Sequence, residues 1–204
     1  MHVTLRRYAD AGARVDEIGR KVEQGLVPIL RDQEGFRLYG AFASEAGDAV
    51  SISVFDRQEQ GAQAHERARG WVQAELRDLL PDPPEVFAGE TGFAELSPGL
   101  RDGARPFVVI RKFEGLGPME ATREVVRKHT APVITGSPGF LAFLNFRDSP
   151  TGTRGAVVTL FDTRDNAIRS HERIVAVLRE HGSGVVPAPS RVLMGQAIII
   201  ALAR

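Results

Sequence analysis

A thirteen-residue segment that occurs twice constrains the fold of this chain more than any other feature. Residues 55–67 read FDRQEQGAQAHER, and residues 161–173 read FDTRDNAIRSHER. Each copy joins the end of an apolar strand pattern to a helical pattern, with Asp56 or Asp162 at the junction. An aspartate side chain there can accept hydrogen bonds from the free amides of a new helix. Further landmarks recur at offsets of 104 to 106 positions, so we interpret the chain as a tandem duplication.

The first copy predicts the element order strand, helix, strand, strand, helix, strand. Apolar residues recur at helical spacing between Val15 and Leu30, and prolines from Pro81 onward stop the second helix. This order is the ferredoxin-like βαββαβ pattern. The strands are expected over residues 2–8, 36–43, 49–55 and 86–96.

The same order begins again after residues 97–106, which are rich in Gly, Pro and charge and are predicted to be a linker. The second copy has strands expected near 108–113, 140–147 and 155–161, a hairpin connection over 148–154 and a helix starting near Pro118. We therefore predict an α+β protein with ferredoxin-like repeats at 1–96 and 107–204. Because each sheet would leave one face bare, the repeats are expected to close as an intramolecular pseudo-dimeric α/β barrel. Separately folded repeats are the alternative.

Composition excludes several classes of partner. Lys plus Arg and Asp plus Glu both number 26, so no global field attracts nucleic acid or an anionic membrane surface. The longest apolar run, 197–203, is too short to span a bilayer. The absence of cysteine removes thiolate chemistry and fits a reducing compartment. We expect a cytoplasmic protein that binds a small molecule, acts as a monomeric pseudo-dimer, and leaves further homo-oligomerisation open.

The two histidines of the repeated segment, His65 and His171, are candidates for chemistry. Each lies on an apolar helical stripe and is therefore expected to face its own sheet. Imidazole suits a general base or a haem ligand. The alternative is a neutral ring hydrogen-bonded to backbone beneath the sheet. The five histidines show no zinc-binding spacing, so no metal site is predicted.

The opposite face of each sheet offers a second set of candidates. In the first strand Val3 and Leu5 form the more apolar pair and are expected to face the helices. Polar and aromatic side chains would then point to the inner face of the barrel, and those we select for catalysis are Arg6, Tyr8, Arg111 and Asn145. Guanidinium groups bind carboxylates or phenolates and stack on rings, which suits a planar aromatic or polyketide-like ligand. The alternative is that both arginines pair with carboxylates at the sheet rim.

A Gly-Phe pair opens the second strand of each copy at 35–36 and 139–140, and an aromatic-Asp pair closes the third strand at 55–56 and 161–162. In these features, and in the Ala-rich helix start that follows, each repeat resembles the antibiotic biosynthesis monooxygenase-like domains of the dimeric α/β barrel superfamily. Members usually have tryptophan before that aspartate, where this chain has Phe55 and Phe161. The resemblance implies cofactor-free monooxygenases, haem-degrading enzymes, haem-dependent chlorite and peroxide enzymes, or domains without a known reaction.

We therefore predict a small-molecule-binding barrel that, if catalytic, oxidises an electron-rich aromatic ligand with dioxygen and no bound cofactor. One alternative is a haem protein with His65 or His171 as axial ligand, and another is a noncatalytic stress or assembly module. The copies diverge at Tyr39 and Ala41, which become Phe143 and Asn145. This divergence indicates that one site was kept and the other filled, without indicating which.

Overall fold

The strands form a closed antiparallel barrel. A computed structural model describes residues 1–149 and 151–204, so Pro150 in the predicted 148–154 connection lies outside the described residues. The hydrogen-bonded order is β1-β3-β2-β8-β5-β7-β6-β4, which closes on itself. The predicted fold class and duplication are confirmed. The strands are β1 His2–Tyr8, β2 Phe36–Ala43, β3 Ala49–Phe55, β4 Glu85–Leu96, β5 Phe107–Phe113, β6 Phe140–Arg147, β7 Gly155–Phe161 and β8 Arg191–Leu202.

The chain divides into two compact units whose boundaries fall inside the two longest strands. Unit 1 consists of residues 1–89, 101–105 and 196–204, and unit 2 of residues 90–100 and 106–195. Strand β4 passes from unit 1 to unit 2 after Gly89, and β8 passes from unit 2 to unit 1 after Gly195. In its second half β4 pairs with β6, and β8 pairs with β2. Each unit therefore receives the end of the other repeat's last strand.

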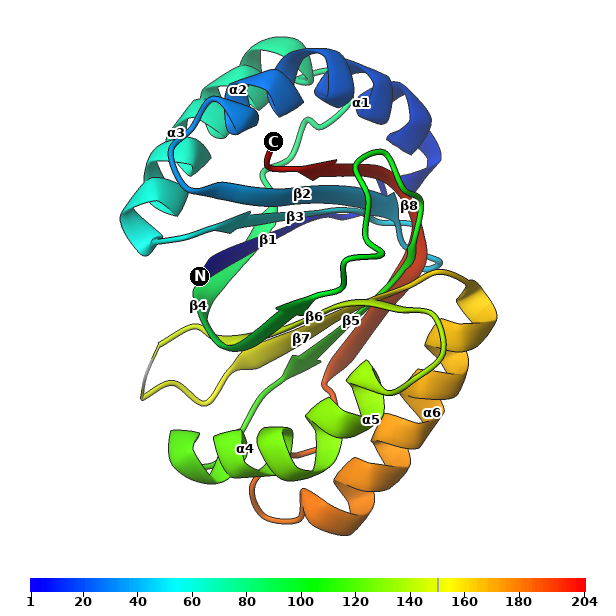
Figure 1. Ribbon diagram of the computed structural model, residues 1–204. Helices are drawn as coiled ribbons and strands as arrows, with labels where there is room; N and C mark the ends of the chain where they lie inside the picture. Colours follow the sequence, from blue (N-terminus) through cyan, green and yellow to red (C-terminus); the bar gives the residue numbers. More distant parts are fainter. Residues whose placement is uncertain (150) are drawn as a thin grey trace. The chain divides into compact units, whose positions relative to one another are not determined.

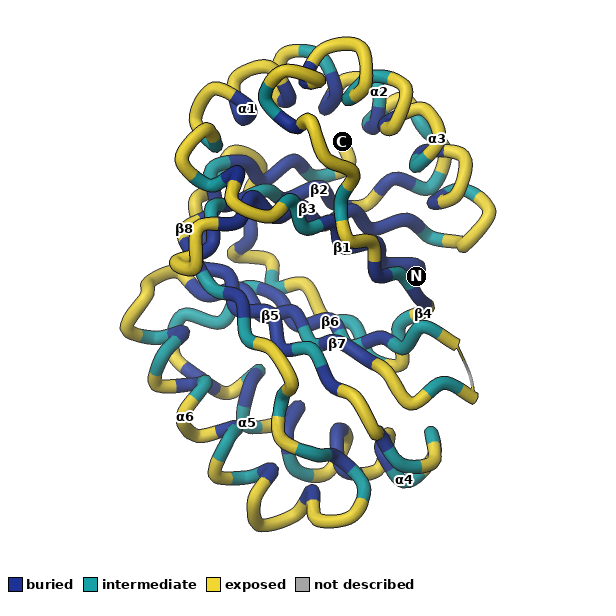
Figure 2. The backbone as a smooth tube through the Cα atoms, turned by 180° about the vertical axis from the view of Figure 1, so that it is seen from behind, coloured by how far each residue is buried: buried dark blue, intermediate teal, exposed yellow. Residues whose placement is uncertain are grey.

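Within each unit the helices cover one face of the strands (Figures 1 and 2). The helices bury their strand-facing residues and expose the rest, as expected for amphipathic helices packed on a sheet. Unit 1 has a short 3-10 turn, Gly12–Arg14, followed by α1 Val15–Lys21, α2 Val27–Arg31 and α3 Gln58–Glu75. Unit 2 has α4 Met119–Val125, α5 Ala131–Thr135 and α6 Arg164–His181.

The first helix of each repeat is interrupted at the same place by a π-helical segment. In unit 1 this segment is Val22–Leu26, and in unit 2 it is Val126–Thr130, 104 positions later. The amide of Val27 bonds to the carbonyl of Val22, which is five residues earlier rather than four. Pro28 follows and has no amide hydrogen to donate, so the regular pattern cannot resume at that residue. The sequence pattern predicted one continuous helix and did not reveal this break.

The change in repeat offset has a simple structural origin. The hairpin connection from Ser44 to Asp48 is two residues shorter than the connection over 148–154, so the offset rises from 104 before the hairpin to 106 after it. The glycines that open β2 and β6 are also explained. Gly35 and Gly139 have positive φ angles of 73° and 72°, and their carbonyls accept hydrogen bonds from the amides of Asp56 and Asp162. These bonds tie the start of one strand to the end of its neighbour.

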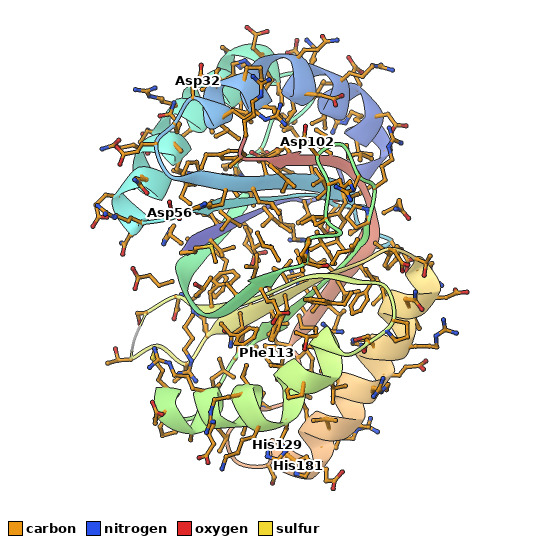
Figure 3. All side chains as sticks on the ribbon, viewed as in Figure 1. Asp32, Asp56, Asp102, Phe113, His129 and His181 are labelled. Carbon is orange, nitrogen blue, oxygen red and sulfur yellow. The ribbon has the colours of Figure 1, made fainter. Side chains whose placement is uncertain are left out.

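The predicted helix cap at Asp56 is wrong by one position. Helix α3 begins at Gln58 with Arg57 as the N-cap, and the amide of Arg57 donates to Oε1 of Gln60. Asp56 precedes the cap (Figure 3) and forms an exposed ion pair with Arg37 at 2.6 Å. In the second copy Thr163 is the cap and accepts from the amide of Asn166. Asp56 is therefore tied to β2, whereas Oδ1 of Asp162 accepts from Nδ2 of Asn166 in the first turn of α6.

We expect Gly35→Ala to destabilise the protein by roughly 1 to 3 kcal/mol, because a non-glycine residue is strained at this positive φ. The added Cβ would also overlap the side-chain amide of Gln60. Equilibrium unfolding in urea measures the change. Gly70→Ala is the matched control, since Gly70 is exposed on α3 and its added Cβ would meet open space. That substitution should raise stability by about 0.5 to 1 kcal/mol. Equal effects at both positions would contradict this account.

Candidate functional site

The predicted orientation of the first strand is wrong, and the correction defines the site. Tyr8 on β1 and Tyr39 on β2 pack in a core cluster with residues of α1, α2 and α3. Val3 and Leu5 are buried but are not members of that cluster. Because side chains alternate along a strand, the even-numbered residues of β1 face the helices and the odd-numbered ones face the other side. The more polar face of the sheet is thus the helix-covered face.

Arg6 and His65 consequently meet. Arg6 is 8% exposed, and its Nη2 donates to Nδ1 of His65 at 2.7 Å, while its Nη1 donates to Oγ of Ser53 at 3.1 Å. His65 faces the sheet as predicted, but its partner is an arginine from the strand and not the backbone. Burial lowers the pKa of Arg6, and the nearby phenols of Tyr39 and Tyr8 act in the opposite direction. The alternative, in which Arg6 pairs with a carboxylate at the sheet rim, is not seen among the described residues.

The second repeat builds the same pair from its own residues. Nε of Arg111 donates to Nδ1 of His171 at 2.9 Å, and Nη1 donates to Oγ1 of Thr159 at 3.2 Å. Arginine has only donor groups, so both histidines must accept through Nδ1 and carry their proton on Nε2 when neutral. Burial and then the arginine charge lower the pKa of both His65 and His171. Both rings are therefore neutral donors at Nε2 near pH 7.

This tautomer does not suit a haem ligand. An axial histidine binds iron through an unprotonated ring nitrogen, and its other nitrogen usually donates a hydrogen bond to a carboxylate or carbonyl. Here the nitrogen that would need to donate instead accepts from Arg6 or Arg111. His65 and His171 therefore do not fit the role of axial haem ligand.

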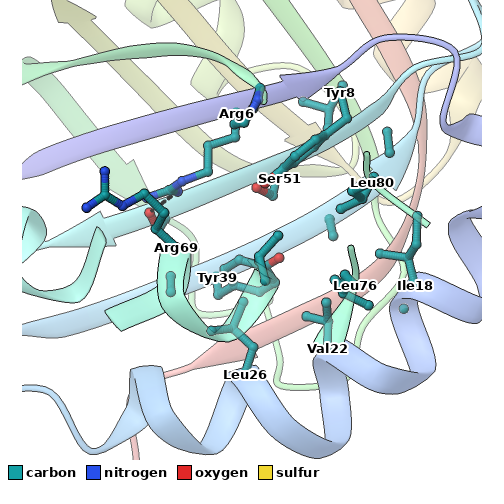
Figure 4. A pocket seen from close by; sticks show the side chains of 18 of the residues that line it. Arg6, Tyr8, Ile18, Val22, Leu26, Tyr39, Ser51, Arg69, Leu76 and Leu80 are labelled. Carbon is teal, nitrogen blue, oxygen red and sulfur yellow. Dashed lines mark hydrogen bonds between the residues drawn. The ribbon is translucent and has the colours of Figure 1, made fainter. Parts of the chain in front are cut away.

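A pocket of about 640 Å³ lies between the strands and helices of unit 1. Figure 4 shows polar and aromatic side chains from the strands facing aliphatic side chains from the helices. The volume is within the usual range for pockets that hold a small molecule. Its exposed lining residues include Arg69 and Asp82, which mark the opening. The strand side is lined by Arg6, Tyr8, Tyr39, Ser51 and Ser53, and the helix side chiefly by Ile18, Val22, Leu26, His65, Val72 and Leu76.

The buried polar groups of this pocket are hydrogen-bond donors or a cation. Burial raises the pKa of Tyr39 to about 12, and Tyr39 shares a hydrogen bond with Ser51. Burial also raises the pKa of Tyr8, although the charge of Arg6 opposes this shift. Both phenols therefore stay protonated at neutral pH. Together with Arg6 and Nε2 of His65, they favour a ligand that brings negative charge on oxygen.

The equivalent space in unit 2 is reduced to a cavity of about 50 Å³. Larger side chains occupy the positions that are small in unit 1, as the strand register and repeat offset show. Asn145 replaces Ala41, Val157 replaces Ser51 and Ile174 replaces Ala68, and all three line the small cavity. The sequence indicated one kept and one filled site, and the structure locates the open one in unit 1.

The structure therefore divides the predicted catalytic set. Arg6 and Tyr8 line the pocket of unit 1, whereas Arg111 and Asn145 line the cavity of unit 2. Sequence reasoning missed the contact between Arg6 and His65 and the contribution of the segment after α3. Pro81, Pro83 and Pro84 line the pocket, although their sequence pattern indicated only the end of a helix.

Other classes of site find little support in the described ranges 1–149 and 151–204. No group of three or more His, Cys, Asp or Glu side chains there is arranged to hold a metal ion. The rings of His129 and His181 stack with their centroids 4.0 Å apart (Figure 3). No helix in those ranges combines the length and apolar character needed to cross a membrane.

Comparisons with known proteins support the fold. No protein-family model matches the chain, and no curated protein matches its sequence. A candidate monooxygenase from Lactobacillus acidophilus superposes with a TM-score of 0.72 at 14% identity, covering 98% of this chain and 95% of that one. An anthrone oxidase-like protein gives 0.62 at 13% identity, with 99% and 93% covered. A haem-binding protein from Thermus thermophilus gives 0.56 at 11%, with 96% and 90% covered. The chain has the dimeric α/β barrel fold of these proteins.

We expect the lowered pKa of His65 to make the folded protein less stable as pH falls. The unfolded chain has the ordinary histidine pKa near 6.5 and takes up its proton first. Stability is then full above about pH 6.5 and decreases as pH falls from there toward the lowered folded pKa. Urea unfolding between pH 7.5 and 5 measures this loss, and His65→Gln should reduce it.

Long-range ¹H–¹⁵N NMR tests the cause directly. Near pH 7 we expect His65 to carry its proton on Nε2 and to accept at Nδ1. Arg6→Met should raise the pKa of His65, because the neighbouring cation is removed. A proton on Nδ1 in the wild-type protein would contradict the assigned pair.

Proposed function

We propose that the chain binds an apolar, ring-bearing molecule with an acidic oxygen in the pocket of unit 1 and oxidises it with dioxygen. The observation that carries this proposal is the buried guanidinium of Arg6, which lies at a largely apolar pocket and contacts only neutral side chains among the described residues. A buried charge is costly unless it is paired. A ligand anion supplies the missing pair.

The surrounding groups define the ligand further. The phenols of Tyr8 and Tyr39 stay protonated and donate, and Nε2 of His65 also donates. Such an array stabilises a phenolate, enolate or carboxylate and lowers the pKa of the bound acid. The aliphatic side chains from α1 and α3 provide the contact surface for a ring system.

The proposed reaction follows from stabilising the enolate. An electron-rich enolate can transfer electrons directly to dioxygen, so the protein supplies binding, charge stabilisation and exclusion of water. For an anthrone, the methylene carbon opposite the ring carbonyl loses two hydrogens and gains one oxygen atom. The second oxygen atom leaves as water, so atoms and electrons balance without a further reductant. Arg6 would hold the enolate oxygen, and Tyr8 and His65 would orient the ring.

The similarity in fold to a candidate monooxygenase and an anthrone oxidase-like protein agrees with this proposal. The similarity to a haem-binding protein is likewise a similarity of fold. Because Nδ1 of His65 and of His171 accepts a hydrogen bond from an arginine, the oxidation of a ring compound is favoured over haem binding. Binding without turnover, as in a noncatalytic module, is an outcome that the experiments below distinguish.

A matched pair of ligands tests the role assigned to Arg6. We expect the protein to bind 9-anthracenecarboxylate more tightly than 9-anthracenemethanol at pH 7.5, because only the first carries a charge. Arg6→Gln should weaken carboxylate binding by roughly 10- to 100-fold, the size of a lost charge-assisted hydrogen bond. Binding of the alcohol should change little. Anthracene fluorescence or calorimetry gives both affinities.

Two variants control this measurement. Arg6→Lys keeps the charge and should retain part of the preference for the carboxylate. Arg37→Gln removes an exposed arginine that pairs with Asp56 outside the pocket, and should leave both affinities unchanged. Equal binding of the two ligands by the wild-type protein would refute the anion site.

Catalysis is tested with 1,8-dihydroxyanthrone. We expect the protein to accelerate oxygen consumption at least about tenfold over the spontaneous reaction, and Arg6→Gln to remove most of that gain. With ¹⁸O₂, one labelled oxygen should enter the quinone carbonyl. Tight binding of 9-anthracenecarboxylate with no acceleration would favour a noncatalytic binding protein instead.

A further inference from the structure

The pocket of unit 1 has a second arginine at its opening. Arg69 on α3 lines the pocket, and its side chain is 59% exposed. It lies one helical turn after His65, on the same face of the helix. Burial lowers the pKa of His65, and the charges of Arg6 and Arg69 lower it further, so both guanidinium groups lie near one imidazole ring. Figure 4 shows both arginines extending toward the same end of the pocket, Arg6 from β1 and Arg69 from α3.

Arg69 is available to a ligand. It forms an ion pair with Glu66, three residues earlier on α3, and both side chains are 59% exposed. Such an exposed pair contributes little to stability, so a ligand can replace Glu66 at small cost. Arg69 and Arg77 bring two cations to the exposed edge of the pocket, whereas Asp82 is the one carboxylate among the described lining residues. The opening is therefore basic.

The second repeat links Arg69 to the open pocket. The buried arginine and its histidine recur in both units, but at the position of Arg69 the second repeat has Val175. The cavity there is reduced to about 50 Å³. Arg67, an exposed arginine of α3 outside the pocket, recurs as Arg173. Arg69 thus accompanies the open pocket and not the shared fold.

We propose that the acid bound in unit 1 carries a second acidic group, a carboxylate at the same end of its ring system, and that Arg69 binds this group at the opening. The inference rests on the proposed function, because it assigns the first acidic oxygen to Arg6. With the carboxylate held at the opening, the neighbouring enolate oxygen faces Arg6. Arg69 is then a positioning residue that decides which end of the ring system lies beside His65.

Three naphthalene acids test this inference with the full chain. 2-Naphthoate has one carboxylate, naphthalene-2,3-dicarboxylate has two at the same end of the rings, and naphthalene-2,6-dicarboxylate has them at opposite ends. At pH 7.5 and low salt we expect the 2,3-isomer to bind roughly three- to tenfold more tightly than 2-naphthoate. The 2,6-isomer should bind no more tightly than 2-naphthoate, because its second charge would enter the apolar part of the pocket. Naphthalene fluorescence or calorimetry gives the affinities.

Variants of α3 identify the group that binds the second carboxylate. Arg69→Gln should remove the gain of the 2,3-isomer and leave binding of 2-naphthoate within about twofold. Glu66→Gln should increase the gain, because it removes a competing carboxylate. Arg67→Gln is the matched control and should leave the gain in place. Added salt should reduce the gain, since Arg69 is exposed.

The outcomes separate this inference from the proposed function. If 2-naphthoate binds through Arg6 but the 2,3-isomer gains nothing, the role of Arg69 is overturned and that of Arg6 stands. The same holds if both dicarboxylates gain equally, or if the gain survives Arg69→Gln. If Arg6→Gln leaves the binding of 2-naphthoate unchanged, the proposed function fails and this inference fails with it.

Discussion

The hydrogen bond from a buried arginine to a neutral histidine is the interaction on which the rest of this structure depends. It occurs once in each repeat, between a strand and the helix that covers it, as Arg6 with His65 and Arg111 with His171. The histidine satisfies one donor but does not neutralise the charge, so each half buries a cation at a cost on the order of several kcal/mol. Such a cost is a physical reason to expect an anion beside Arg6, while the hydrogen bond from each arginine to Nδ1 holds its histidine as the Nε2–H tautomer.

Small and large side chains decide how much space lies near each arginine. Around Arg6, residues Ala41 and Ala68 leave room for a pocket of about 640 Å³. Around Arg111, their counterparts Asn145 and Ile174 leave about 50 Å³. The π-helical segments lie against both sites and place Val22 and Val126 in their linings. Duplication within one chain allows this divergence, because two identical subunits would have to carry the same substitutions.

Much of the fold was predictable from the repeated segment, because the βαββαβ order follows from apolar periodicity and from turn residues at matching offsets. The faces of the strands were not predictable in the same way. Every residue of β3 is buried, so its alternation carries no signal for which side meets the helices. The more apolar set of alternating strand residues, which includes Val3 and Leu5, was expected to face the helices but lies on the opposite face of the sheet. Because the orientation of the strand is the reverse of the prediction, Arg6 lies on the helix side of the sheet and contacts His65 directly. The π-helical break also left no mark in the hydrophobic pattern, because the buried residues Val22, Leu26 and Leu30 recur at helical spacing across it.

The central claim is that one anionic ring compound binds per chain, on the helix-covered face of unit 1, with its charge on Arg6. A crystal structure of the wild-type protein with 9-anthracenecarboxylate tests this most directly. The account predicts a single ligand, enclosed by strands β1 to β3 and helices α1 to α3, with a carboxylate oxygen within hydrogen-bond distance of the Arg6 guanidinium. A ligand bound elsewhere, or one in the same pocket with its carboxylate turned toward the opening and away from Arg6, would contradict it.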